Sequence, residues 1–137
     1  MSTNSSPYML LFRDSSPSRY ATLSPEQMQQ FFTEWHNWYD RLAAEGKLDH
    51  GRPLEPEGRL VSGVHGDRIT DGPFAESKES IAGYFLLTVG SMEEATEIAR
   101  SCPSLRHGAA VEIRQVAGMC PIARSMEERR KEELLAV

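Results

Sequence analysis

The chain has 137 residues, 39% of them hydrophobic, which is enough for one domain with a single core. Its net charge of −5, with no cluster of Lys and Arg, argues against direct binding to nucleic acid, because the chain would repel a phosphate backbone. No apolar run approaches the roughly 20 residues of a membrane helix, and the N-terminus lacks a signal-peptide pattern. We therefore expect a cytoplasmic protein with no membrane partner.

A strand and a long helix are the first elements predicted along the chain. After a disordered polar lead over residues 1–7, the run YMLLFR at 8–13 is short and apolar on both faces, which is typical of a strand. A helix then begins at Ser24 as the N-cap, with Gln27 at the spacing of a capping box, and ends at Gly46. Its apolar stripe comprises Met28, Phe31, Phe32, Trp35, Trp38, Tyr39 and Leu42.

Shorter elements follow. Residues 47–63 are broken by Gly and Pro and fit one or two short strand pieces, and His65-Gly66-Asp67 reads as a tight connection between two strands. The run IAGYFLLTV at 81–89 is the strongest strand signal in the chain. Ser91 then opens a second helix with a capping box, and residues 110–116 form the last strand, which we expect to be interior.

This order of elements predicts an α+β fold. Strand, helix, short strands, strand, helix, strand is the βαββαβ arrangement of a ferredoxin-like sandwich, in which both helices cover one face of an antiparallel sheet. The chain then divides into a lead at 1–7, a domain at 8–117 and a C-terminal helical tail at 118–137. Leu134 and Leu135 are the residues by which this charged tail would dock.

The second face of the sheet also needs a cover. The first strand and the run Tyr84 to Val89 are apolar on both faces, and the two helices account for only one of them. We expect a homodimer through the sheet face, and the alternative is that the long loops fold over the sheet.

Cofactor and metal signatures are lacking in the sequence. Cys102 and Cys120 are each followed by proline and form no CxxC pair, so they read as reduced thiols. The sequence has no GxGxxG, GxxxxGK[ST] or GxSxG motif, and its His and acidic residues follow no metal-site spacing. We expect no cofactor and no metal.

The stretch TDGPFAESKE at 70–79 has two interpretations. Asp71 and Gly72 fit a surface turn, in which the carboxylate accepts a backbone N–H. However, three carboxylates, a lysine and an aromatic side chain within ten residues exceed what a hairpin tip needs, and favour the wall of a cleft.

Several motifs along the chain resemble the YCII-related family, in the branch called DGPF-domain proteins. They are GKLDHGRPLEPEGRLV, with the stretch from Trp35 to Trp38 before it, DGPFAESKE, IAGYFLL and SMEEATEIARSCPSLRHGAAVEIRQV, and the resemblance covers residues 8–117. It implies a dimeric α/β barrel built from ferredoxin-like units. In some relatives that are thought to be enzymes, a His and an Asp lie in a cleft, and one class removes chloride from an aromatic ring. Members of the branch also occur with extracytoplasmic-function sigma factors.

The candidate catalytic residues are Asp71 with His36 or His65. A helix histidine close to His36 is proposed as catalytic in simpler relatives, although the alignment is off by one residue, and a histidine at the edge of the core is the alternative. The candidate substrate-binding residues are Phe74, Glu76, Lys78, Glu79, Glu112 and Arg114. Glu112 and Arg114 alternate out of the core face of the last strand, and in the alternative interpretation they pair only with each other or with Lys78 and Glu79. Gln115 stands where the family usually has proline, a departure at the end of this strand.

Three hypotheses about function follow. The first is a small lyase-like or hydrolase-like enzyme, in which Asp71 moves a proton on a small organic substrate held near Arg114. The second is a non-catalytic module that binds a small molecule and reports to a partner such as a sigma factor. The third is a plain dimeric scaffold.

Overall fold

A four-stranded sheet, two covering helices and two extensions make up the chain. The computed structural model describes residues 7–14, 17–72 and 80–136. Its elements are β1 (Tyr8–Arg13), the 3-10 helix η1 (Pro17–Thr22), α1 (Pro25–Ala44), β2 (Leu48–Pro53), β3 (Arg59–Ser62), β4 (Arg68–Asp71), β5 (Ile81–Leu87), α2 (Met92–Ala99), the 3-10 helix η2 (Pro103–His107), β6 (Ala110–Gln115) and α3 (Pro121–Leu135).

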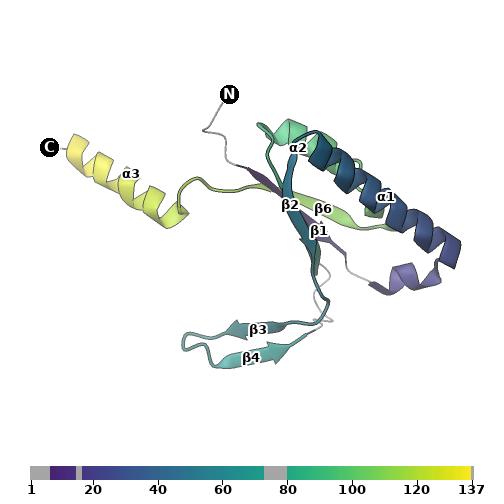
Figure 1. Ribbon diagram of the computed structural model, residues 1–137. Coiled ribbons are helices and arrows are strands. Elements are labelled where there is room, and N and C mark those ends of the chain that lie inside the picture. Colours follow the sequence, from purple (N-terminus) through teal and green to yellow (C-terminus); the bar gives the residue numbers. More distant parts are fainter. Residues whose placement is uncertain (1–6, 15–16, 73–79, 137) are drawn as a thin grey trace.

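The sheet has the strand order β2-β5-β1-β6, and each neighbouring pair is antiparallel (Figure 1). The ferredoxin-like prediction is therefore confirmed, with β3 and β4 forming a separate hairpin inserted between β2 and β5. The expectation that 110–116 is an interior strand is wrong, because β6 lies at the sheet edge and pairs with β1 alone among the described strands.

Helix α1 begins and ends where its capping residues predict. The Ser24 hydroxyl accepts a hydrogen bond of 3.1 Å from the backbone N–H of Gln27, and the Gln27 side chain accepts one of 2.8 Å from Ser24 N–H. Gly46 follows the helix with a φ of +71°, which glycine adopts without strain. In α2, the Ser91 hydroxyl accepts from the N–H of Glu94 at 3.1 Å, so both helix starts were predicted correctly.

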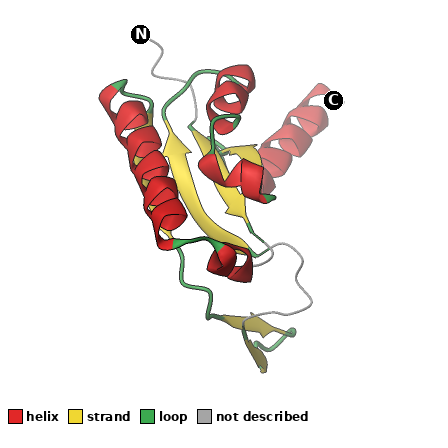
Figure 2. Ribbon diagram, turned by 90° about the vertical axis from the view of Figure 1, so that its right-hand side faces the viewer, coloured by secondary structure: helices red, strands yellow, loops and turns green. Residues whose placement is uncertain are grey.

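The core lies between the helices and one face of the sheet. Alternate residues of β1 are buried, as expected for a strand with one covered face, and both helices lie on that face (Figure 2). The buried apolar residues of these elements are Tyr8, Leu10, Phe12, Leu48, Phe85 and Leu87 on the strands, and Trp38, Leu42, Ala95, Ile98 and Ala99 on the helices. Burial of this set is the main stabilising contribution to the fold.

Two extensions leave this body on the other side of the sheet (Figures 1 and 2). One is the β3–β4 hairpin, called the arm below and taken as residues 54–72. The other is α3, which buries no side chain over its described length. Leu134 and Leu135, the predicted docking residues, are exposed, so α3 makes no such contact with the described part of its own chain.

None of the described helices covers the second face of the sheet. Met9, Leu11, Tyr84 and Leu86 point to this face, since they alternate with the buried residues of β1 and β5, and they are half-buried. We call this surface the open face. Among the described helices, none is long and apolar enough to cross a membrane.

Candidate functional site

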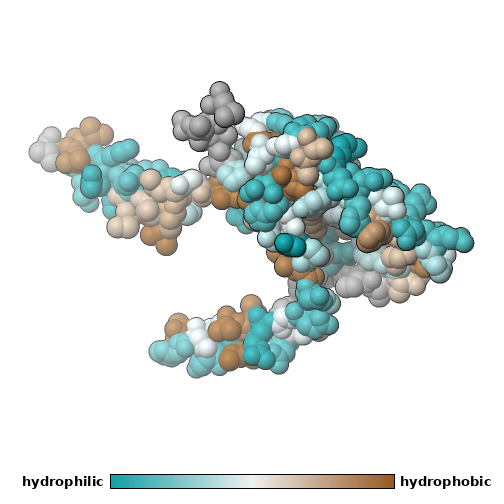
Figure 3. All heavy atoms as spheres, in the orientation of Figure 1, coloured by the Kyte–Doolittle hydropathy of each residue, from teal (hydrophilic) through white to brown (hydrophobic). Residues whose placement is uncertain are grey.

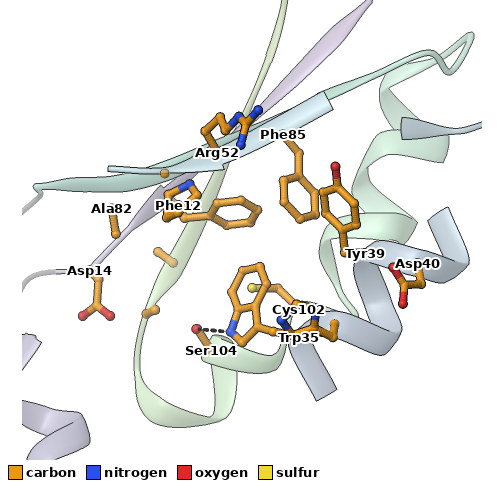
Figure 4. Close-up of a pocket in the computed structure, with 16 residues that line it drawn as sticks. Phe12, Asp14, Trp35, Tyr39, Asp40, Arg52, Ala82, Phe85, Cys102 and Ser104 are labelled. Carbon is orange, nitrogen blue, oxygen red and sulfur yellow. Dashed lines mark hydrogen bonds between the residues drawn. The ribbon is translucent and has the colours of Figure 1, made fainter. Parts of the chain in front are cut away.

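A cavity of about 650 Å³ lies between α1 and the core face of the sheet (Figure 4). Phe12 and Phe85 line it from the strands, and Trp35 and Tyr39 line it from α1. Polar groups lie among them, contributed by Asp14, His36, Asp40, Arg52 and Ser104. The volume falls within the range of known pockets for small organic molecules, about 300 to 1,000 Å³.

The cavity exists because small residues occupy the strands that floor it. Gly51, Ala82, Gly83 and Ala110 all line it. A Cβ atom on Gly51 would lie 2.3 Å from Cδ1 of Phe85, and one on Gly83 would lie 2.8 Å from the carbonyl oxygen of Arg52. Larger side chains at these positions would therefore displace the Phe85 ring or the β2 backbone.

The aromatic walls hold one another by edge-to-face contacts. The Phe12 ring centroid lies 5.1 Å from that of Trp35 and 4.9 Å from that of Phe85, at interplanar angles of 85° and 88°. Tyr39 meets Phe85 at 5.6 Å and 78°. Trp35 is fixed further by its Nε1–H, which donates a hydrogen bond of 3.2 Å to the hydroxyl of Ser104. Edge-to-face contacts between rings contribute stability beyond the burial of apolar surface area. The aromatic side chains that line the cavity are therefore held in position before a ligand binds.

Asp14 lies at one end of the cavity, with 8% of its surface exposed. Its Oδ2 accepts a hydrogen bond of 2.6 Å from the hydroxyl of Tyr20. Its backbone N–H donates to the carbonyl of Ser80 at 3.0 Å, and its own carbonyl accepts from the Ser80 hydroxyl at 2.8 Å. A carboxylate at a strand end, held on both backbone and side chain, is therefore in a fixed position at the cavity.

His36 brings an imidazole to the same cavity from α1, and Asp40 follows it one helical turn later. The His36 ring lies 4.2 Å from the ring of Phe32, centroid to centroid, and its residue is exposed at the cavity mouth. Of the three candidate catalytic residues, His36 is the one that lines the cavity. Its catalytic role stays a prediction.

The other two candidate catalytic residues lie on the arm. Asp71 ends β4, where its carboxylate pairs with Nε of Arg59 at 2.7 Å, and His65 lies in the turn between β3 and β4. The ladder from the Arg59–Asp71 pair to the Ser62–Arg68 pair separates them, so they are at opposite ends of the hairpin. Within the described structure, neither lines the cavity, and a catalytic role for them stays a prediction.

The substrate-binding candidates are divided between two places. Phe74, Glu76, Lys78 and Glu79 lie outside the described residues. Glu112 and Arg114 pair in register with Leu11 and Met9, so they project from the open face, as predicted.

Glu112 is the centre of a small ion-pair cluster on that face. The Nε of Arg13 donates to Glu112 Oε1 at 2.6 Å, and Nη1 of Arg114 lies 3.7 Å from Glu112 Oε2. The two predicted residues therefore pair with each other, as in the alternative interpretation, and Arg13 joins them.

Four polar residues of the cavity were missed at the level of sequence, namely Asp14, Asp40, Arg52 and Ser104. Asp14 directly follows the predicted first strand and Asp40 lies in the predicted long helix, and neither was among the candidate site residues. A carboxylate placed directly after an apolar strand was the available signal for Asp14, because the end of a core strand is a place where a polar group can enter a cavity.

The cysteines differ in their surroundings. Cys102 lines the cavity and is buried, and that burial raises the pKa of its thiol to about 11. It is therefore protonated near neutral pH and is no nucleophile there. Cys120 is exposed before α3, and hydrogen bonds from the backbone N–H groups of Ala123 and Ile122 lower the pKa of its thiol. Within the described ranges, no three His, Cys, Asp or Glu residues are placed to hold a metal ion.

Comparisons with known proteins identify a family and show a distant similarity to solved structures. A family model described as the YCII-related domain matches residues 7–119. No curated protein matches the chain at a significant level. Among solved structures, a 5-chloro-2-hydroxyhydroquinone dehydrochlorinase from Burkholderia phenoliruptrix, in complex with 2,5-dihydroxybenzoquinone, is 14% identical, with a TM-score of 0.45. The match covers 80% of this chain and 93% of that one.

Proposed function

The chain belongs to the YCII-related domain family, and from this premise we propose that it is an acid–base enzyme for a small hydroxylated aromatic molecule bound between α1 and the sheet. The observation that carries the proposal is a single cavity that combines four aromatic walls with a buried, fixed carboxylate, Asp14. Apolar pockets with a few convergent polar groups are the usual form of small-molecule sites.

The lining supports a flat, uncharged ring as the ligand. Phe12, Trp35, Tyr39 and Phe85 offer ring faces and edges to a planar molecule. Asp14 and Asp40 accept hydrogen bonds, which suits the hydroxyl groups of a phenol or catechol. Among the lining residues, the carboxylates of Asp14 and Asp40 outnumber the one guanidinium, that of Arg52, so like charges disfavour an anionic ligand such as benzoate.

The proposed chemistry uses two proton transfers. Asp14 is the base that takes a proton from a bound hydroxyl group, and His36 is the acid that gives a proton to a ring carbon conjugated with that hydroxyl. The electron pair of the broken O–H bond then forms the C=O bond, and a π pair of the ring forms the new C–H bond. The protein then carries the same number of protons as before, moved from one side chain to the other. Solvent can restore the starting state through the exposed His36. A halide on the protonated carbon then leaves with its bonding electron pair while a second hydroxyl group of the ring loses its proton to solvent, which gives a quinone and free halide. The reaction class is therefore that of a lyase, and Asp14 has the role that the sequence led us to expect for Asp71.

A thermal-shift comparison of catechol and benzoate tests binding. Catechol at a hundred times its Kd should stabilise the parent protein by about 2.7 kcal/mol. Benzoate should give a smaller shift at equal concentration. The Asp14→Asn variant should keep its fold and lose most of the catechol effect, whereas Asp71→Asn should behave as the parent protein does. Equal shifts for Asp14→Asn and the parent would contradict the proposal.

Turnover is tested separately by incubating the parent and His36→Gln variants with halogenated and unhalogenated catechols and analysing the products by mass spectrometry. Loss of product in His36→Gln with retained binding supports the acid role. Binding without any product would favour the non-catalytic module instead. Association with a sigma factor stays a prediction from the family resemblance.

A further inference from the structure

A second hollow, called the groove below, lies between α1 and the segment that runs from the end of α2 into η2. Its volume is about 500 Å³, and neither Asp14 nor His36 lines it. The residues that α1 contributes to it are Glu34, Asn37, Trp38 and Arg41, at the three- and four-residue spacing of one helix face. The residues of α1 that line the cavity are all different from these, so the helix separates the two sites.

Positive charge is concentrated at the groove. Arg41 lines it from the last turn of α1, Arg100 is the C-cap residue of α2, and Arg106 lies in η2. Glu34 is the one acidic residue among the lining residues, although the whole chain has a net charge of −5. Each arginine lies near the C-terminal end of its helix, where the helix dipole favours a cation. The dipole does not account for the meeting of three such arginines at one groove.

The chain itself does not neutralise all three guanidinium groups. Arg106 pairs with Glu34, and Nε of Arg100 lies 3.1 Å from Oε1 of Glu97 on α2. The guanidinium of Arg41 has no ion pair within the described part of the chain, and Arg41 is exposed. An arginine fork with no partner of its own is free to bind the oxygens of a carboxylate or a phosphate.

The groove also has a buried donor that lacks an acceptor. Trp38 is 3% exposed, and its indole Nε1–H has no hydrogen-bond partner among the described residues. Trp35, by contrast, donates from the same atom to the hydroxyl of Ser104 at 3.2 Å. Buried polar groups in folded proteins are nearly always paired, so an unpaired N–H on a residue that lines a groove points to an acceptor from outside the chain.

The surroundings of the groove suit a small polar ligand. In Figure 3 the outer surface of α1 and α2 is mostly hydrophilic, whereas apolar side chains gather on the arm. Apolar contact within the groove comes from Pro103 and Leu105, beside the arginines. A charged group with a short apolar body therefore fits this place better than the apolar surface of another protein does.

We propose that the groove binds a phosphate group, either of inorganic phosphate or of a small phosphate ester. The guanidinium groups among the lining residues exceed the carboxylates by two, which matches the charge of a phosphate dianion. Phosphate oxygens accept hydrogen bonds in several directions, so one group can bind Arg41, Arg106 and the Nε1–H of Trp38 together. This site is independent of the cavity and of the reaction proposed there.

The two indole N–H signals in a ¹H–¹⁵N NMR spectrum test the site, because Trp38 lines the groove and Trp35 lines the cavity. Inorganic phosphate, added at an ionic strength held constant with sodium chloride, should shift the Trp38 signal until it saturates. The Trp35 signal should hardly move. A Trp38 signal that does not shift overturns the proposal, and so does an equal shift when sodium chloride is added alone.

A matched pair of variants tests the arginines. Arg41→Gln should weaken phosphate binding at least about tenfold, because it removes a hydrogen bond between two charged groups. Arg68→Gln is the control, since it removes the same charge from an exposed position on the arm and should leave the affinity unchanged. Circular dichroism should show that both variants are folded, because both side chains are exposed. Equal affinities in the two variants would overturn the proposal.

Butyl phosphate distinguishes the two sources of the phosphate group. Tighter binding than that of inorganic phosphate indicates an ester whose alkyl part contacts Pro103 and Leu105. Equal or weaker binding indicates inorganic phosphate itself.

Discussion

The hydroxyl of Tyr20, in η1, donates a hydrogen bond of 2.6 Å to Oδ2 of Asp14 at the end of β1. The Tyr20 ring in turn stacks on Phe31 of α1 at 5.1 Å and 19°. The carboxylate of the cavity is therefore held by a side chain that α1 itself keeps in place. Tyr20 is a positioning residue in the proposed function, since it acts on the ligand through Asp14.

Replacing Tyr20 with Phe should keep the stack on Phe31 and remove the hydrogen bond. We expect a loss of about 1 kcal/mol in the free energy of unfolding, measured by urea denaturation. Calorimetry should also show weaker catechol binding, because Asp14 loses its orientation. Tyr39→Phe, which removes a hydroxyl from the cavity without touching Asp14, is the control for the loss of a hydroxyl as such. Unchanged catechol affinity in Tyr20→Phe would show that Asp14 needs no such support.

Gly51 should tolerate no side chain. In Gly51→Ala the new Cβ would lie 2.3 Å from the Phe85 ring and 2.7 Å from the carbonyl oxygen of Tyr84. We expect destabilisation of about 1 to 3 kcal/mol, as for other overpacked sites, together with weaker catechol binding. Gly58→Ala is the matched control, because a Cβ there meets no atom within 4 Å. Equal melting temperatures for the two variants would refute the close packing of Gly51 on Phe85.

The two thiols should differ sharply in reactivity. Iodoacetamide at pH 7.5 should alkylate Cys120, whose pKa is lowered by backbone N–H groups and whose side chain is exposed. Cys102 should react only after unfolding, because it is buried and its pKa is raised. Peptide mass mapping with and without urea distinguishes the two sites. Early labelling of Cys102 would mean that the cavity opens readily.

Cys102 should also make stability depend on pH above 9. Burial raises the pKa of this thiol from 9.0 to about 11, so between these values the unfolded chain releases a proton that the folded chain retains. Stability is therefore full below pH 9 and falls as the pH rises toward 11, by up to about 2.7 kcal/mol. The measurement is the difference in unfolding free energy between the parent and Cys102→Ala at each pH, because other groups titrate equally in both. A constant difference across the window would contradict the prediction.

Asp71→Asn should be nearly silent in stability. The carboxylate and its partner Arg59 are both exposed, and surface ion pairs contribute at most about 1 kcal/mol. Under the proposed function, the variant also keeps its activity and its catechol binding. Abolished turnover with an intact fold would instead restore Asp71 to the catalytic role predicted from the sequence.

Local signals in the sequence were sufficient to predict most of the fold. The caps at Ser24 and Ser91 and the glycine at 46 mark helix ends through interactions within a few residues, so they need no knowledge of the tertiary structure. Strand order is a different matter. The pattern of 110–116 fits an edge strand and an interior strand equally well, and only the pairing with β1 places it at the edge.

The site was harder to predict because its parts are far apart in the chain. His36 became a candidate because relatives have a helix histidine close to its position, but the cavity beside it depends on Gly51 and Gly83, which carry no chemical signature of a site. Asp71 attracted attention because turns and active sites favour the same residues. Asp14 was not proposed as a site residue for the same reason, because an aspartate directly after a strand is most simply explained as part of the turn that ends it.

The arm leaves β2 after Pro53, and the chain re-enters the sheet at Ile81, on the strand that pairs with β2. The two strands are already joined to each other by their own ladder, which extends to the hydrogen bond from Leu54 N–H to the carbonyl of Ala82. Because β2 and β5 pair with each other directly, their pairing places little constraint on the segment inserted between them. A longer insertion there adds little to the entropic cost of closing the loop. The length and sequence of this segment can therefore change without altering the cavity between α1 and the sheet.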